Sequence, residues 1–492
     1  MISIYKWATL LFTSYQYLLF LPTVVALYWI LPQKYRLPLL FVASYFFYMS
    51  WIPIFGVLIF AMTLGNWLLG KLIAKAENKK PLLILGVAAN LLCLGYFKYA
   101  NFFIDTAQQL VSTITHHPSA SITLNIILPL GISFFVFEFI HYLVELSRGK
   151  KPIDSFVLFA LFAAFFPTQI AGPIKRYEDF AAQMQEEKKI KLSYFDEGIP
   201  LIVIGLAKKL LIADNLAVFV DMFAKTNYAY GSLETWFFAY VFAMQIYFDF
   251  SGYTDIGRGS AHLFGYHIPI NFNFPYIATS IADFWRRWHI SLSTWLRDYL
   301  FIPLGGSRCS KWINDRNLLL TMALGGLWHG AGMNFIVWGI YHGMLLVVHS
   351  HFAKWRERQT TLKPYLESWY FRLFSTVLTF HCVCIGWVFF RIHDFGQMLS
   401  MVKKMVLFSP ILTKVEAGEF LILKPELPVS VPVAIMITIG LLIATPTISY
   451  ASQKGWIARI PKPLKAVYVT AVILAIVTFL PDNSTPFIYF QF

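Results

Sequence analysis

The chain has 492 residues, of which 58% are hydrophobic and only 13% are charged, and its mean hydropathy is +0.60. A soluble domain is typically about 45–50% apolar and about 25% charged, so this composition excludes disorder, a coiled coil and most soluble enzymes. Phe, Trp and Tyr make up 18% of the chain, which suits lipid-facing helices and interfacial belts. We therefore expect a polytopic helical membrane protein.

The net charge of +14 would suggest a nucleic-acid partner in a soluble protein. In this chain the basic residues fall largely between apolar runs, where Lys and Arg favour the cytoplasmic side of a membrane. We therefore expect no nucleic-acid binding. The four cysteines have no zinc-type spacing, and we expect buried thiols and no metal.

A helical span needs about 20 mainly apolar residues. Candidate spans lie at residues 15–31, 37–51, 54–69, 82–97, 128–146, 198–212, 236–250, 374–390, 431–448 and 466–480. Clusters of Lys and Arg follow the first, third and fifth of these runs. An N-terminus outside the cell places all three clusters in the cytoplasm.

Residues 156–173 interrupt this simple count, because they contain Phe166-Pro167 and Ala171-Gly172-Pro173 with basic residues on both sides. This pattern predicts a re-entrant hairpin that enters and leaves the membrane on the cytoplasmic side. The alternative is an interfacial helix. Non-helical backbone at membrane depth persists only where protein packs around it or where it lines a wet cavity. The more polar residues 354–367 and 391–426 are expected to form loops.

Residues 271–316 are rich in Trp and Arg and hold too many charges for a span, so we expect helices at the cytoplasmic surface. The apolar residues 317–328 that follow would reach only about 18 Å as a helix, against a bilayer core of roughly 30 Å. His329 is therefore expected within the membrane near mid-depth, at a break made by Gly330 and Gly332. The run at residues 333–348 can leave from the same place.

Ionisable residues inside a membrane are costly, so each is a functional candidate. A first group follows the apolar run at 236–250 and consists of Asp249, Ser251, Tyr253, Asp255 and Arg258. The structural alternative is a network at a helix end, in which Asp255 pairs with Arg258 three residues later. No metal motif accompanies the two carboxylates.

A second group lies between Asp283 and Leu292, where the tryptophans predict an amphipathic interfacial helix. Its basic residues can attract a phosphate or an acidic carrier protein; they are Arg286, Arg287 and the nearby Arg297. His289 lies one helical turn after Trp285. By itself, a histidine in such a helix is most often a structural hydrogen-bonding residue.

The third group surrounds His329 with glycines, which let backbone or ligand approach closely. A neutral imidazole at mid-depth can take a proton from a hydroxyl nucleophile, a general-base role that typically contributes about 10²–10⁴-fold in rate. A structural role is the alternative. The other histidines are expected to be structural, with His141 and His342 the least settled. The chain has no P-loop, no dinucleotide-binding glycine motif, no HExxH and no Gly-x-Ser-x-Gly.

Taken together, the motifs resemble the membrane-bound O-acyltransferases, specifically the bacterial branch of alginate O-acetyltransferases and teichoic-acid D-alanyl transfer proteins. The resemblance covers nearly the whole chain, from Tyr45-Phe46-Phe47-Tyr48 to the final residues 487–492. Its central motifs are Leu128-Pro129-Leu130-Gly131, Ala171-Gly172-Pro173, the run from Asp249 to Arg258, Asn271-Phe272-Asn273-Phe274-Pro275, Phe284-Trp285-Arg286-Arg287-Trp288-His289 and Gly326-Leu327-Trp328-His329-Gly330.

The resemblance implies an all-α, polytopic helical bundle with re-entrant segments and a central tunnel. It implies one membrane-embedded domain over residues 1–492, with a catalytic core at about 128–350, in the bacterial cytoplasmic membrane. It makes His329 catalytic and places His289 on the same pathway; other branches carry Asn or Asp at the second position. Residues expected to bind the donor or brace the site are Asp249, Ser251, Tyr253, Asp255, Arg258, Asn273, Arg286, Arg287, Trp288, Arg297 and Trp328.

The implied activity is transfer of an acyl group, by preference acetyl, from a cytoplasmic thioester to an exported polysaccharide such as alginate. The donor would be acetyl-coenzyme A or the phosphopantetheine of an acyl carrier protein, and no bound cofactor is expected. Expected partners are membrane lipid, the polysaccharide and a periplasmic acetyltransferase. The alternatives are D-alanyl transfer to teichoic acid, a non-enzymatic glycan or lipid transporter, and a scaffold for periplasmic enzymes.

Overall fold

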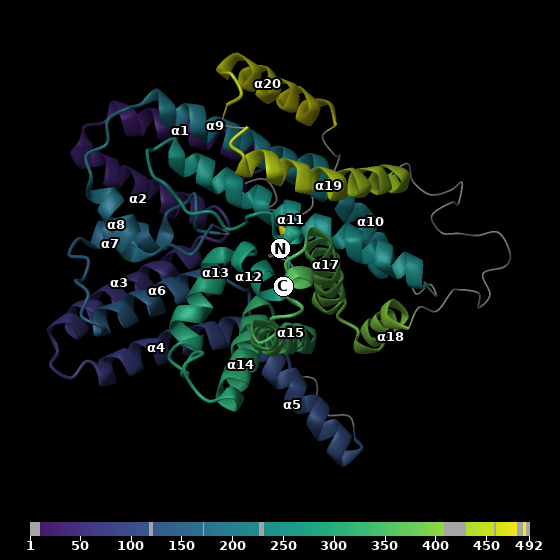
Figure 1. Cartoon of the computed structure of the whole chain (residues 1–492). Helices are drawn as coiled ribbons and strands as arrows, with labels where there is room; N and C mark the ends of the chain where they lie inside the picture. Colours follow the sequence, from purple (N-terminus) through teal and green to yellow (C-terminus); the bar gives the residue numbers. More distant parts are fainter. Residues whose placement is uncertain are drawn as a thin grey trace. The chain divides into compact units, whose positions relative to one another are not determined.

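A computed structural model describes residues 10–117, 122–170, 172–225, 231–407, 430–456, 459–479 and 486–488. Every regular element within these ranges is a helix (Figure 1), which confirms the all-α prediction. Ala171 of one motif, residues 489–492 of another and residues 408–426 of a predicted loop lie outside the described ranges.

The chain divides into two compact units. The first comprises Met1–Ile202 and Tyr253–Pro269, and the second comprises Val203–Gly252 and Ile270–Phe492. The helices that begin in the first stretch are α1 (Tyr15–Ile30), α2 (Gln33–Met49), α3 (Ile54–Lys75), α4 (Lys80–Leu94), α5 (Ala100–Thr115), α6 (Ile132–Ser147), α7 (Phe156–Ala164), α8 (Tyr177–Gln185) and α9 (Leu192–Leu206).

The later helices are α10 (Asp214–Lys225), α11 (Ser232–His262), α12 (Ile281–Arg287), α13 (Ile290–Leu296), α14 (Lys311–His329), α15 (Met333–Glu357), α16 (Lys363–Leu366), α17 (Trp369–Arg391), α18 (Phe395–Val406), α19 (Ser430–Gln453) and α20 (Lys462–Thr478). Two of them matter most for the site. α14 and α15 form a hairpin, and α14 ends at His329 just before α15 begins.

Four helical stretches in the described residues are long and apolar enough to cross a membrane. They are Ile54–Lys75, Lys80–Thr115, Met333–Glu357 and Trp369–Arg391, and Tyr15–Ile30 is a shorter apolar helix. All five overlap runs that the sequence marks as apolar, which confirms a multi-pass membrane protein. The side on which each helix end lies stays a prediction.

Irregular backbone interrupts the predicted re-entrant segment at residues 156–173, which lies in the first unit. α7 ends at Ala164, and the irregular backbone that follows packs against α6 through a buried ion pair between Lys175 and Glu138, with 2.9 Å between Nζ and Oε1. The Lys175 ammonium also donates to the Thr168 hydroxyl at 2.9 Å. The irregular segment is therefore enclosed by protein, the condition for such backbone in a membrane. Its entry from the cytoplasm stays a prediction.

The hairpin of α14 and α15 is unusually close, and glycine is the reason. A Cβ atom on Gly326 would collide with the carbonyl oxygen of Phe335, and one on Gly339 would collide with that of Met322. The two helix backbones therefore touch where any side chain would separate them. This contact fixes the direction in which the chain leaves His329.

The prediction of loops at 354–367 and 391–426 is only partly right in its described part, since residues 358–362 and 392–394 are non-helical and most of the other described residues are helical. α15 continues to Glu357, α16 forms a short turn, and α18 follows α17. Buried Met398, Met401 and Met405 give α18 an apolar face at helical spacing, and Asp394 caps its start by accepting from the Gln397 N–H at 2.6 Å. The polar residues between these methionines hid that face in a simple hydropathy count.

Candidate active site around His289 and His329

His289 lies at a break between two short helices, where the sequence predicts one continuous amphipathic helix. α12 ends at Arg287, Trp288 has extended backbone, and His289 has a φ of +41° before α13 begins at Ile290. The Nδ1 atom of His289 accepts a hydrogen bond from the Leu292 N–H at 3.4 Å. The prediction of one helix is therefore wrong, because the ring of His289 itself caps the second one.

Asn271 holds this break in place. Its backbone carbonyl accepts from the Ile290 N–H at 3.0 Å, and its side-chain oxygen accepts from the Ser291 N–H at 3.1 Å. The N–H of Asn273 donates to the Arg287 carbonyl at 2.9 Å. Asn271 is buried. The sequence marks it only as part of a motif, because a separation of 18 residues does not predict contact with His289.

His329 is the last residue of α14, so the predicted break after it is confirmed. The ring centroids of His289 and His329 lie 6.4 Å apart, although 40 residues of sequence separate them. Both rings are buried, with 0% and 4% of each residue exposed. The fold thus brings the two predicted histidines to one place.

Aromatic rings enclose the histidine pair on several sides. His329 contacts Trp328, Trp338 and Phe390 at centroid distances of 5.1, 5.1 and 5.4 Å. His289 contacts Phe250 at 4.8 Å and Trp328 at 6.0 Å. These rings come from α11, α14, α15 and α17 and form a largely apolar wall around the two imidazoles.

Trp288, predicted to bind or brace, belongs to the aromatic core of the second unit. Its ring lies 4.8 Å from Trp387 and 5.0 Å from Phe272, and the residue is 1% exposed. It therefore orients the backbone that carries His289 and offers no open surface to a donor.

Asp249 lies well inside α11, so the prediction of a network at a helix end is wrong for this residue. It belongs to a buried cluster with Lys209, whose Nζ lies 2.8 Å from a carboxylate oxygen of Asp214 and 2.8 Å from one of Asp249. The other oxygen of Asp249 accepts from the Ile488 N–H at 2.7 Å. Lys209 and Asp214 were missed by sequence reasoning, and their only signal was a charge inside the apolar run at 198–212 and another just after it.

Ser251 follows in the same helix and is buried, and its hydroxyl has no hydrogen-bond partner among the described residues. Tyr253, Asp255 and Arg258 belong to the first unit. There the predicted pairing of Asp255 with Arg258 is confirmed at 3.3 Å, and Arg258 also donates to the Ile268 carbonyl at 3.2 Å. Their role as braces of the histidines stays a prediction.

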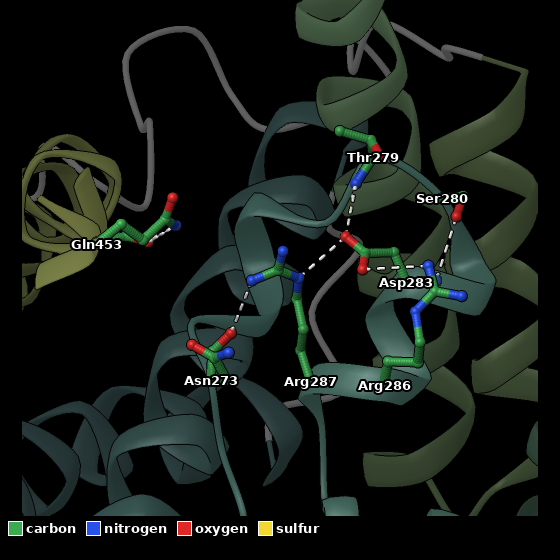
Figure 2. Close-up of polar contacts among 8 residues, drawn as sticks. Asn273, Thr279, Ser280, Asp283, Arg286, Arg287 and Gln453 are labelled. Atoms are coloured by element: carbon green, nitrogen blue, oxygen red, sulfur yellow. Dashed lines mark hydrogen bonds and ion pairs between the residues drawn. The ribbon is translucent and has the colours of Figure 1, made fainter.

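The arginines predicted to hold the donor are paired with nearby aspartates, as Figure 2 shows for α12. Asp283 lies 3.3 Å from the Arg286 guanidinium and 2.9 Å from that of Arg287, and Arg287 also donates to the Asn273 carbonyl at 3.2 Å. Arg297 pairs with the adjacent Asp298 at 2.7 Å. The side chains of Arg286 and Arg297 are 69% and 59% exposed, which leaves them accessible to an anionic donor.

Relatives with curated names resemble this chain over most of its length. It is 43% identical over 389 residues to a probable alginate O-acetylase AlgI of Pseudomonas syringae, a match covering 77% of this chain and 72% of that protein. It is 35% identical over 460 residues to a peptidoglycan O-acetyltransferase of Helicobacter pylori, covering 85% of each. A teichoic acid D-alanyltransferase of Bacillus subtilis is 35% identical over 293 residues, covering 56% and 70% respectively.

The model of the membrane-bound O-acyltransferase family matches residues 81–390, which is more than half of the chain and includes His289 and His329. The all-helical architecture and the apolar helices long enough to span a membrane agree with that match. This chain therefore belongs to the membrane-bound O-acyltransferase family and is a multi-pass O-acyltransferase.

Proposed function

We propose that the chain transfers an acetyl group from a cytoplasmic thioester to hydroxyl groups of an exported polysaccharide of the alginate type. The observation that carries this proposal is the approach of two buried imidazoles, 6.4 Å apart, inside an aromatic wall. The preference for acetyl cargo is supported by the activities after which the AlgI and peptidoglycan O-acetyltransferase relatives are named.

In this mechanism His329 is the general base. A neutral imidazole takes the proton of the acceptor hydroxyl while the hydroxyl oxygen attacks the acyl carbon of the thioester. The new C–O bond forms, the C–S bond breaks, and the proton held on His329 passes to the departing thiolate. The donor is acetyl-coenzyme A or an acylated phosphopantetheine carrier, and the step needs no bound cofactor.

His289 has a complementary role. Because its Nδ1 accepts from the Leu292 N–H, the proton of its neutral ring lies on Nε2, which makes that atom a donor. A donor beside the base suits the orientation of the acceptor hydroxyl or the stabilisation of the oxyanion that develops on the thioester carbonyl. The two histidines thus divide proton acceptance and proton donation between them.

We place the donor on the cytoplasmic side, at the exposed Arg286 and Arg297, and the acceptor on the outer side of the bacterial cytoplasmic membrane. Guanidinium groups suit the phosphates of coenzyme A or phosphopantetheine. The acetyl group reaches the polysaccharide directly or through a periplasmic acetyltransferase. Residues 1–492 act as one membrane-embedded domain with its catalytic core at about 128–350.

The test uses full-length protein in nanodiscs with radiolabelled acetyl-coenzyme A, or acetylated carrier protein, and alginate as acceptor. We expect His329→Ala to lower transfer of label by about 10²–10⁴-fold because the general base is lost. Replacement of the exposed His117 by Ala is the matched control and should leave transfer unchanged. Transfer at the wild-type rate by His329→Ala would overturn the proposal and favour a transporter or scaffold.

D-alanyl transfer is the second candidate, and the teichoic acid D-alanyltransferase relative favours it. The same preparation offered a D-alanyl carrier protein distinguishes the two cargoes. Label transferred from the D-alanyl carrier but not from either acetyl donor would replace acetyl by D-alanine and leave the role of His329 intact.

A further inference from the structure

A cluster of two histidines and one glutamate lies in the first unit, and the acyl-transfer mechanism does not use it. Glu197 is on α9, His262 is the last residue of α11, and His267 follows in the next turn. Each offers one possible ligand atom, and the three atoms lie within 4.8 Å of one another. We propose that Glu197, His262 and His267 bind a divalent zinc ion that ties α9 to the end of α11.

Helix packing brings the glutamate to this place. A Cβ atom on Gly198 would lie 2.8 Å from the Gly259 carbonyl oxygen, and one on Gly259 would lie 2.6 Å from that of Gly198. Glycines on both helices therefore let the backbones of α9 and α11 touch. Glu197 precedes the first of these glycines, so its carboxylate is held beside His262.

The turn after α11 positions the second imidazole. The Gly265 N–H donates to the His262 carbonyl at 2.8 Å, and the Tyr266 N–H donates to the Ala261 carbonyl at 3.1 Å. With Gly265 at a φ of +80°, this pattern closes the helix end and turns the chain back. His267 therefore returns to His262, and the two ring centroids lie 4.7 Å apart.

The backbone of His267 is clamped while its ring points into the cluster. The side-chain amide of Gln183 on α8 accepts from the His267 N–H at 2.8 Å and donates to the His267 carbonyl at 3.1 Å. These two bonds use only main-chain atoms of His267. The imidazole ring of His267 takes no part in these bonds and is therefore available to bind the metal ion.

The contact between His262 and Glu197 is better explained by a shared ion than by direct bonding. Nδ1 of His262 lies 3.6 Å from Oε2 of Glu197, which is too long for a hydrogen bond. Two ligand atoms, each about 2.1 Å from a tetrahedral zinc ion, lie about 3.4 Å apart. Nδ1 is buried and has no hydrogen-bond partner among the described residues, and the His262 side chain is only 8% exposed.

The donor set selects the class of metal. Imidazole and carboxylate together suit zinc and its neighbours among the transition metals, and calcium and magnesium prefer oxygen ligands. A water molecule would complete the coordination of zinc at a site with three protein ligands.

Tag-free, full-length protein in nanodiscs is stripped with a chelator, titrated with Zn²⁺ and assayed for bound metal by mass spectrometry. We expect wild type to retain about one zinc per chain and to unfold at a higher temperature with zinc. Glu197→Gln and His267→Gln change exposed side chains, so both variants should fold. Loss of a second-shell partner costs about 10–100-fold in metal affinity, so loss of a direct ligand should cost at least about 100-fold.

His117→Gln, which removes an exposed histidine of the first unit, is the control and should bind zinc like wild type. Zinc affinity in Glu197→Gln and His267→Gln equal to that of the control would overturn the proposal, as would failure of wild type to retain zinc. Acetyl transfer is measured separately on the same samples, so a negative result here leaves the test of His329 unaffected.

Discussion

Asn271 controls the position of His289 without touching the reacting atoms. Its side-chain oxygen is the partner of the Ser291 N–H, directly after the His289–Ile290 peptide. Asn271→Ala leaves that buried N–H without its acceptor, at a cost of about 1–3 kcal/mol. We expect kcat to fall by about 100-fold, because a displacement of His289 by about 1 Å would cost about that much in rate. KM for the donor should change little.

Steady-state kinetics in nanodiscs provide the measurement, and Asn271→Asp, which keeps the acceptor oxygen, should restore most of the activity. A loss of activity that Asn271→Asp does not restore would argue against this positioning role.

Lys209 is a buried cation that faces the carboxylates of Asp214 and Asp249. Removing one partner of a buried ion pair typically costs about 3–5 kcal/mol, because the remaining charge stays buried. We therefore expect Lys209→Met to lower the thermal unfolding midpoint clearly, as measured by fluorescence in detergent. Lys75→Met, at an exposed position on α3, is the control, and equal midpoints for the two variants would contradict the expectation.

At the scale of helices, the close contact of α14 and α15 sets the approach of His329. Gly326→Ala places a methyl group against the Phe335 carbonyl. Overpacking of this kind costs about 1–3 kcal/mol, and relief by separation of the hairpin would also move His329. We expect both the unfolding midpoint and acetyl transfer to fall.

Gly440→Ala on α19 is the matched control, since among the described residues no atom outside its own helix backbone lies within 4 Å of the added Cβ. It should be neutral or slightly stabilising, because alanine favours the helix. A fall in midpoint for Gly440→Ala equal to that for Gly326→Ala would show that the loss comes from the helix and not from the hairpin contact.

Apolar runs were sufficient to predict most helices, and the glycines after His329 were sufficient to predict its break. Apolar runs did not predict the helix boundaries that are set by a side-chain hydrogen bond and not by a change in hydrophobicity. His289 caps α13 through its own ring, and no local pattern marks a histidine for that task. α18 was missed because its face consists of three methionines among polar residues.

At the scale of the molecule, a residue near the end of the sequence bonds to the middle of α11. The Ile488 N–H donates to Asp249 across 239 residues, and the Phe487 ring lies 5.7 Å from Phe250, which contacts His289. Ile488→Pro removes that donor, and loss of a hydrogen bond to a charged group costs about 1.5–3 kcal/mol. We expect a lower unfolding midpoint and slower acetyl transfer.

Ile488→Val keeps the N–H and is the control for the change in side chain. If Ile488→Pro and Ile488→Val behave alike in unfolding and in transfer, the hydrogen bond to Asp249 has no role in holding the site.

The candidate site shows why tertiary contacts limit prediction from sequence. The pairing of His289 with His329 was expected only from the family resemblance, because a separation of 40 positions in the sequence carries no information on their distance. Asp249 pairs with Lys209, which also pairs with Asp214 five residues later, and accepts from the Ile488 N–H; no spacing rule relates Asp249 to these two segments. Asp255 and Arg258 were predictable because three residues along a helix place side chains on one face.

The left-handed backbone at His289 restricts which amino acids can evolve at that position. Among residues other than glycine, Asn, Asp and His tolerate such a φ best, whereas β-branched residues such as Val and Thr do not. The resemblance places His, Asn or Asp at this position across the family, which is the same short set. The backbone thus limits position 289 to a few residue types, and the proton donation proposed for His289 would select only among them.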